Sequence, residues 1–281
     1  MANDNAWDLT NGHGYILDRD RSHAAASRLN LQFYLWKDAL KYNIHPTISA
    51  TLPKTATIAE VASGTCLWLI DVAREYPEAQ LDGFDYNLRQ APAKEWLPSN
   101  AKTAYWNVFD EPPEELKGRY DYVHTRLLVL VVEAKDPRPI IRNLFALLKP
   151  GGYLQWDELD ATNMYIRKVR QDQDTPALDF LKDWAEADGR RDWTVKLPQF
   201  FTELGFQDAK IDFVGEPPEL ARAYNDQHLL TAEEFAEGLV KLGQSETASK
   251  YFRMVEQAYE ESTSGAGLCA PKVVCTARKP I

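Results

Sequence analysis

The order of elements between residues 57 and 85 constrains the fold most strongly. An apolar run over Thr57–Ala62 has the composition of a buried strand, and it ends at a turn of small residues around Gly64. An amphipathic helix over Leu67–Tyr76 follows, and a second apolar run, Gln80–Asp85, ends in an acid. Such a turn lets backbone N–H groups approach a ligand, and an acid at the next strand end can bind ribose hydroxyls. The order therefore predicts a nucleoside pocket.

The turn differs from the loops that bind phosphate groups. It lacks the Gly-x-Gly-x-x-Gly pattern of dinucleotide sites, and no Gly-Lys-Ser/Thr follows it. The sequence therefore favours a ligand that carries a ribose but no phosphate.

Strand and helix patterns continue to alternate as far as residue 160. We expect a short helix over residues 88–96, and a longer helix that begins at Asp136-Pro137, with Asp as its cap. Further strands are expected at Thr103–Trp106, Tyr120–Thr125 and Tyr153–Trp156. This alternation predicts an α/β fold with a doubly wound, mostly parallel, seven-stranded Rossmann-like sheet and helical lid insertions.

The pattern changes after residue 160. We expect residues 161–190 to be mainly helical, and the sixth and seventh strands to lie at Ala209–Val214 and Lys272–Ala277. Two further helices are expected within 218–262, one of them beginning at a capping box, Thr231–Glu234.

Three regions are predicted on this basis. Residues 1–50 form an N-terminal arm and helical cover, residues 51–160 a cofactor-binding core, and residues 161–281 the remaining strands with helical substrate-lid insertions. A helix over 22–43 carries a stripe of apolar side chains, which is either a packing face or a wall of the substrate cavity: Leu29, Phe33, Trp36 and Leu40.

Four motifs in order resemble the class I S-adenosylmethionine-dependent methyltransferases, and more narrowly their fungal branch in secondary metabolism. They are Glu60-x-Ala62-x-Gly64-Thr65-Cys66, Gly83-Phe84-Asp85, Tyr120-Asp-Tyr-Val-His124-Thr-Arg126 and Leu148-Lys-Pro-Gly-Gly-Tyr-Leu-Gln-Trp156. Ala62 and Cys66 stand where many members carry glycine. The resemblance extends to Arg28-Leu29-Asn30 and is much weaker after residue 160.

The resemblance implies S-adenosyl-L-methionine as cofactor. Asp85 would bind the ribose hydroxyls, although an acid that caps the following turn is the alternative. Glu60 would organise the turn near the methionyl amine, and Asn107 with its two neighbours would contact adenine. The complete set of cofactor-binding residues predicted in this way is Tyr15, Arg28, Glu60, Ala62, Ser63, Gly64, Asp85, Tyr86, Asn107, Val108, Phe109, Thr125 and Arg126.

Two catalytic residues are predicted at strand ends. His124 is a candidate general base, because imidazole titrates near neutral pH, and Glu158 could orient a hydroxyl or an amine. A structural histidine and a solvated acid are the alternatives. Arg126 could bind a carboxylate or form a structural ion pair.

The composition of the chain argues against several classes of binding partner. The chain has 32 Lys and Arg against 42 Asp and Glu, a net charge of −10, which opposes nonspecific binding to nucleic acid or to anionic membranes. His, Cys and carboxylate spacings match no metal site, and the cysteines show no Cys-x-x-Cys pair. We expect a cytoplasmic protein that acts on a small molecule without a metal, and a homodimer is left open.

The resulting prediction is an enzyme that transfers a methyl group to an oxygen, nitrogen or sulfur atom of a small molecule, such as a secondary metabolite. Two alternatives are a cyclase or pericyclase of the same fold that keeps its cofactor intact, and a nonenzymatic regulator. A concave apolar cavity favours either enzyme over the regulator.

Overall fold

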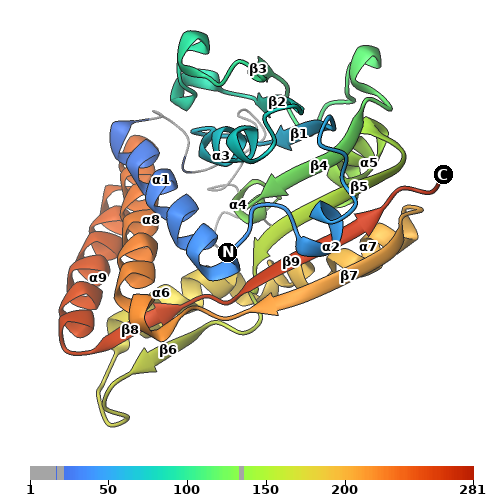
Figure 1. Ribbon diagram of the computed structural model, residues 1–281. Helices are drawn as coiled ribbons and strands as arrows, with labels where there is room; N and C mark the ends of the chain where they lie inside the picture. The colour runs from blue at the N-terminus through green and yellow to red at the C-terminus, as the bar shows by residue number, and fades with distance from the viewer. Residues whose placement is uncertain (1–16, 18–21, 133–135) are drawn as a thin grey trace.

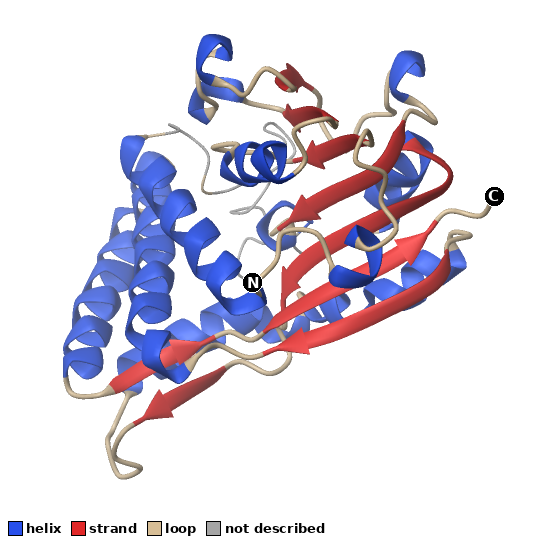
Figure 2. Ribbon diagram, in the orientation of Figure 1, coloured by secondary structure: helices blue, strands red, loops and turns tan. Residues whose placement is uncertain are grey.

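The computed structural model describes residue 17 and residues 22–132 and 136–281. Within this part of the chain the main sheet has the strand order β3-β2-β1-β4-β5-β9-β7 (Figures 1 and 2). The strands are β1 (Thr57–Val61), β2 (Gln80–Asp85), β3 (Ala101–Tyr105), β4 (Tyr120–Arg126), β5 (Leu148–Leu159), β7 (Gln207–Val214) and β9 (Lys272–Arg278).

The sheet is mostly parallel, which confirms the predicted fold class. The pairs β1–β2, β1–β4, β2–β3 and β4–β5 are parallel, whereas β9 runs antiparallel to both β5 and β7. Because β9 alone is reversed, β5 and β7 point the same way. The start of β9 therefore lies at the edge where β5 and β7 end, and ligands bind at this edge in such sheets.

Helices cover the sheet and also stand beyond its ligand-binding edge. They are α1 (His23–Leu40), α2 (Pro46–Ser49), α3 (Leu67–Glu75), α4 (Val129–Val132), α5 (Arg138–Leu147), α6 (Pro176–Glu186), α7 (Leu197–Glu203), α8 (Ala221–Lys241) and α9 (Ser245–Thr263). Figure 1 shows α1, α8 and α9 together on the side toward which β4 and β5 point. Local signals explain some of these boundaries: the Ser22 side chain caps α1 by accepting from the Ala25 N–H.

Two hydrophobic cores hold the layers together. One packs α5 and α7 against the sheet around the fully buried Trp156, and the other packs α2 and α3 around Ile58 and Tyr122. No helix in the described ranges is both long and apolar enough to span a membrane.

The prediction of a mainly helical segment over 161–190 was wrong in its first part. Residues Tyr165–Lys168 form strand β6, which pairs antiparallel with β8 (Ala266–Cys269) in a second, two-stranded sheet. Helix α6 begins only at Pro176. The pairing joins segments about 100 residues apart, so no local pattern announces it.

Two smaller predictions also fail. Residues 88–96 form two short 3-10 turns, Leu88–Gln90 and Lys94–Trp96, in place of one helix. The capping box at Thr231 is absent because α8 runs through it, and the Thr231 hydroxyl donates to the Gln227 carbonyl one turn earlier. Tertiary packing of α8 outweighs this local signal.

Candidate active site

A cavity of about 220 Å³ opens at the carboxyl ends of β1, β2 and β4. Eleven of the predicted site residues line it, namely Arg28, Glu60, Ala62, Ser63, Gly64, Asp85, Tyr86, Asn107, Val108, His124 and Arg126. Phe109, Thr125 and Glu158 are not part of the wall. Tyr15 lies outside the described residues, so its role stays a prediction.

The turn after β1 takes left-handed backbone conformations at three positions. Ala62 has φ 60°, Gly64 φ 52° and Cys66 φ 62°. The turn is closed by the Cys66 N–H, which donates to the Ser63 carbonyl at 2.7 Å. Ala62 and Cys66 therefore adopt the backbone that glycine accepts without cost, at positions where the resemblance indicated a missing glycine.

Asp85 joins the end of β2 to this turn. Its Oδ2 accepts from the Gly64 N–H and its Oδ1 from the Asn87 N–H, each at 2.9 Å. The turn-capping contact considered as the alternative is thus present. Each carboxylate oxygen can accept more than one hydrogen bond, so these contacts leave room for ribose hydroxyls.

Glu60 is buried, and its Oε2 has no hydrogen-bond partner within the described residues. Burial raises the pKa of Glu60 well above its ordinary value, although Arg126 acts in the opposite direction. Because an unmatched buried carboxyl oxygen is costly and Glu60 lines the cavity, this side chain is suited to bind an ammonium group.

The wall after β3 combines an aromatic ring with amide groups. The Asn107 side chain accepts from the Phe109 N–H at 3.1 Å, which fixes the loop. The Trp106 Nε1–H is buried without a partner in the described part. Phe109 packs against the core and does not line the cavity, so the cavity does not support its predicted contact with adenine.

His124 and Arg126 share one partner, Asp157. His124 Nε2 lies 3.2 Å from an Asp157 oxygen, and Arg126 binds the same oxygen at 2.7 Å. The His124 ring stacks on Trp68 with centroids 4.0 Å apart. Burial lowers the pKa of His124 to about 4 despite the opposing effect of Asp157. The ion-pair alternative for Arg126 is the one present, and His124 is neutral at pH 7.

Glu158 and Thr125 form hydrogen bonds within the protein and do not line the cavity. Glu158 Oε1 accepts from the Leu128 N–H and the Trp156 ring N–H, and burial raises the pKa of Glu158 to about 8. The Thr125 hydroxyl donates to the Val61 carbonyl and ties β4 to β1. Glu158 is not the solvated acid considered as its alternative, since it is fully buried.

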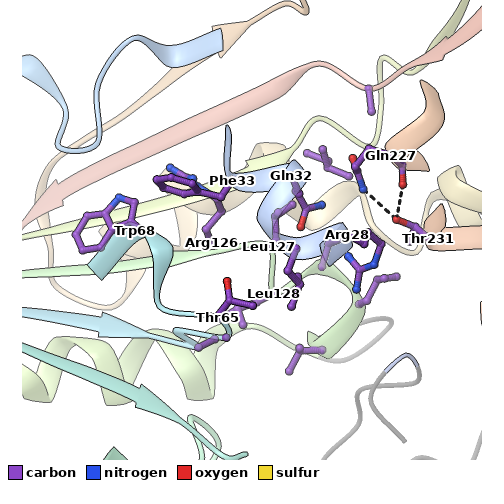
Figure 3. Close-up of a pocket in the computed structure, with 18 of the residues that line it drawn as sticks. Arg28, Gln32, Phe33, Thr65, Trp68, Arg126, Leu127, Leu128, Gln227 and Thr231 are labelled. Atoms are coloured by element: carbon purple, nitrogen blue, oxygen red, sulfur yellow. Dashed lines mark hydrogen bonds between the residues drawn. The ribbon is translucent and has the colours of Figure 1, made fainter. Parts of the chain in front are cut away.

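The rest of the cavity wall comes from residues that the sequence analysis did not name as site residues, although it predicted a cover in 1–50 and a substrate lid in 161–281. It is mostly apolar and includes Gln32, Phe33, Leu127–Val131, Leu159, Met164, Leu181, Trp184, Ala185, Arg191, Gln227, His228, Thr231, Ala232, Leu268 and Ala270. Figure 3 shows Gln227 and Thr231 joined by a hydrogen bond at the opposite end of the view from Trp68. In the helix stripe, Phe33 lines the cavity while Trp36 and Leu40 pack inside, so both readings of the stripe hold in part.

Arg28 fixes the position of α1 over this cavity. Its side chain is 4% exposed, and its Nε lies 2.7 Å from Glu234 on α8. The described residues contain no group of three His, Cys, Asp or Glu side chains arranged to hold a metal ion.

Comparison with known proteins shows which fold the chain has and which proteins its central part resembles. A family model of a methyltransferase domain matches residues 59–154, the stretch that builds the turn, Asp85 and His124. The methyltransferase grgD of a Penicillium species is 41% identical over 111 residues, which cover 37% of this chain and 38% of that protein. Residues 59–154 are therefore similar to the methyltransferase domain of the class I S-adenosylmethionine-dependent enzymes.

A second methyltransferase relative, the N-methyltransferase tcpN of Claviceps purpurea, is 28% identical over 148 residues, about half of each chain. Among solved structures, the putative methyltransferase bound to the Haloferax volcanii Trm112 activator shares the fold, with a TM-score of 0.53 at 13% identity, covering 94% of this chain and 99% of that one. The matched segments span about half or less of the curated relatives.

The residues fit the cofactor that class I methyltransferases bind, S-adenosylmethionine. The decisive observation is the unpartnered Glu60 oxygen on a residue that lines the same cavity as the Asp85 carboxylate, since the cofactor offers both an ammonium group and a ribose. The sequence predicted that the substrate side of the cavity would come from 1–50 and 161–281, but it named no substrate-binding residue in 161–281, because α8 and β8 follow the matched stretch. In 1–50, the apolar stripe of α1 was the signal that pointed to two wall residues, Leu29 and Phe33.

Proposed function

We propose that the protein transfers a methyl group from S-adenosylmethionine to a small molecule, such as a fungal secondary metabolite. The observation that carries this proposal is a single cavity with a polar end at the turn after β1 and an apolar end under α1, α6 and α8. A cavity of this kind favours an enzyme over the regulator alternative.

At the polar end we assign Asp85 to the ribose hydroxyls and Glu60 to the methionyl ammonium. Asn107 and Val108 would contact the adenine, and Ser63 and Gly64, which line the cavity, would lie along the ligand. These roles rest on the burial of both acids and on their place in one wall.

The cofactor supplies an activated methyl group, so the protein's own task is mainly alignment and exclusion of water. We assign the cover to α1 and α8, which are held together by the Arg28–Glu234 ion pair and by the Tyr224 hydroxyl, which donates to the Leu35 carbonyl. This division corresponds to an N-terminal cover, a cofactor core over 51–160 and a substrate lid within 161–281.

Labelled S-adenosylmethionine and a panel of small polyketide- and peptide-like molecules test this function. We expect S-adenosylhomocysteine to appear in proportion to a methylated product. Product that forms while the cofactor stays intact would replace methyl transfer by the cyclase alternative. A protein that binds the cofactor but converts nothing would contradict both.

A further inference from the structure

The far end of the cavity holds a second histidine. His228 on α8 lines the wall beside Gln227, and its side chain is 14% exposed. Unlike His124, it has no ring stacked on its face among the described contacts. His124 has its Nε2 on Asp157 and a pKa lowered to about 4 by burial, so it is poorly suited as a base near neutral pH.

A buried carboxylate faces His228. Glu216 follows the end of β7 at the ligand-binding edge, and its side chain is 1% exposed. Its Oε1 lies 3.7 Å from His228 Nε2 and 3.1 Å from Lys272 Nζ at the start of β9. Both His228 Nε2 and Glu216 Oε2 are buried without a hydrogen bond in the described part. A small shift of the imidazole would join them, and such contacts often tighten when substrate binds.

This arrangement orients the imidazole. Glu216 carries the negative charge that favours a proton on Nε2, and Nδ1 is then the nitrogen left to accept. Lys272 holds Glu216 in place: it is itself 1% exposed and lies 4.1 Å from the Tyr224 ring centre.

The rest of the wall indicates the charge of the molecule bound there. The three arginines that line the cavity already have partners: Arg28 pairs with Glu234, Arg126 with Asp157, and Arg191 donates to the Ala185 carbonyl. The remaining surface is apolar around Leu181 and Trp184. A neutral, mostly apolar molecule with a hydrogen-bonding group fits this wall better than an anion.

We propose that His228, oriented by Glu216, accepts the proton of a hydroxyl group on a neutral, mostly apolar substrate. The inference rests on the proposed methyl transfer. The hydroxyl O–H bond breaks as its proton passes to Nδ1, and the oxygen forms a bond to the methyl carbon. The bond between that carbon and sulfur breaks with its electron pair left on sulfur, giving a neutral thioether and a protonated imidazole.

The test compares 2-naphthol with 2-naphthylamine, which have the same apolar naphthalene ring and differ only in the acceptor group. A neutral amine attacks through a free lone pair and needs no prior base. With the full chain and labelled S-adenosylmethionine, we expect His228→Asn to slow single-turnover transfer to naphthol by roughly 10²–10⁴-fold. Transfer to naphthylamine should change by less than about tenfold. Asparagine keeps a polar group beside Glu216 but cannot act as the base.

Three measurements keep the outcomes distinct. Calorimetry with S-adenosylhomocysteine and thermal unfolding check that His228→Asn binds cofactor and folds as the parent protein does, and His228→Gln serves as a second variant. Quenching of tryptophan fluorescence by naphthol checks that substrate still binds. Three results would overturn the role of His228. The rate of naphthol methylation could be equal in parent and variant, or it could fall in His124→Asn and not in His228→Asn. The third is a protein that binds cofactor but does not methylate naphthol. Absence of cofactor binding in the parent protein would overturn the proposed function itself.

Discussion

The Asp85 carboxylate accepts a hydrogen bond from the Gly64 N–H at 2.9 Å, which ties the end of β2 to the turn after β1. The acid therefore sets the shape of the turn and also lines the cavity. Replacing it affects both the backbone and any ligand at this place, so each prediction about the site needs a matched control.

The left-handed backbone at Ala62 predicts an unusual response to glycine. Glycine removes the free-energy cost of a φ of 60°, which is roughly 1–2 kcal/mol. Part of this gain is offset because glycine gives the unfolded chain more conformational entropy. We expect Ala62→Gly to raise the free energy of unfolding by about 0.5–1 kcal/mol. Ala26→Gly, within helix α1, should lower it by about 1 kcal/mol. Urea unfolding measures both, and equal losses in the two variants would argue against strain at Ala62.

Burial of His124 predicts a pH dependence of stability. The folded pKa is lowered to about 4, whereas an unfolded histidine titrates near 6.5. Between these values the unfolded chain binds a proton that the folded protein does not, so stability falls as pH falls from about 6.5 to 4. His124→Phe keeps a ring against Trp68 and should therefore lose about 2 kcal/mol less than the parent between pH 7 and pH 5. Parallel pH profiles would rule out this effect.

Burial of Glu158 predicts a pH dependence of stability in the opposite direction to that of His124. Burial raises its folded pKa to about 8, so the folded protein keeps a proton that the unfolded chain releases above about pH 4.3. Its contribution to stability is present at low pH and is lost as pH rises to about 8. We expect Glu158→Gln to gain stability over the parent between pH 5 and pH 8, on the order of 3 kcal/mol. Single-turnover methyl transfer should change by less than about tenfold, and a larger loss would return Glu158 to catalysis.

The sequence was most informative where strand and helix patterns are local. The turn, Asp85 and the strands up to residue 160 could be predicted directly, because burial on a parallel sheet leaves apolar runs with polar residues at their ends. The strand β6 could not, since its partner β8 is distant in the chain. Whether His124 titrates near neutral pH also depends on contacts with Trp68 and Asp157 that no spacing reveals.

The assignment of α1 and α8 to a cover predicts that hydrogen exchange in these helices responds to bound ligands. If α1 and α8 close over the cavity, backbone amides in residues 23–40 and 221–241 should exchange hydrogen more slowly once cofactor and substrate are bound, because closure suppresses local opening. Strand β4 in the core should change little and serves as the internal control. Unchanged exchange in both helices would contradict a closing cover.

Calorimetric titration with S-adenosylhomocysteine tests the cofactor site most directly. Asp85→Asn removes the charge that we assign to the ribose contact, usually worth about 1.5–3 kcal/mol, so the dissociation constant should rise about 10- to 100-fold. Asp82→Asn makes the same change three residues earlier, on a side chain that accepts from the Tyr120 hydroxyl and is absent from the cavity wall, and it should leave affinity within about twofold. Unchanged affinity in a folded Asp85→Asn protein would contradict the cofactor site at the end of β2.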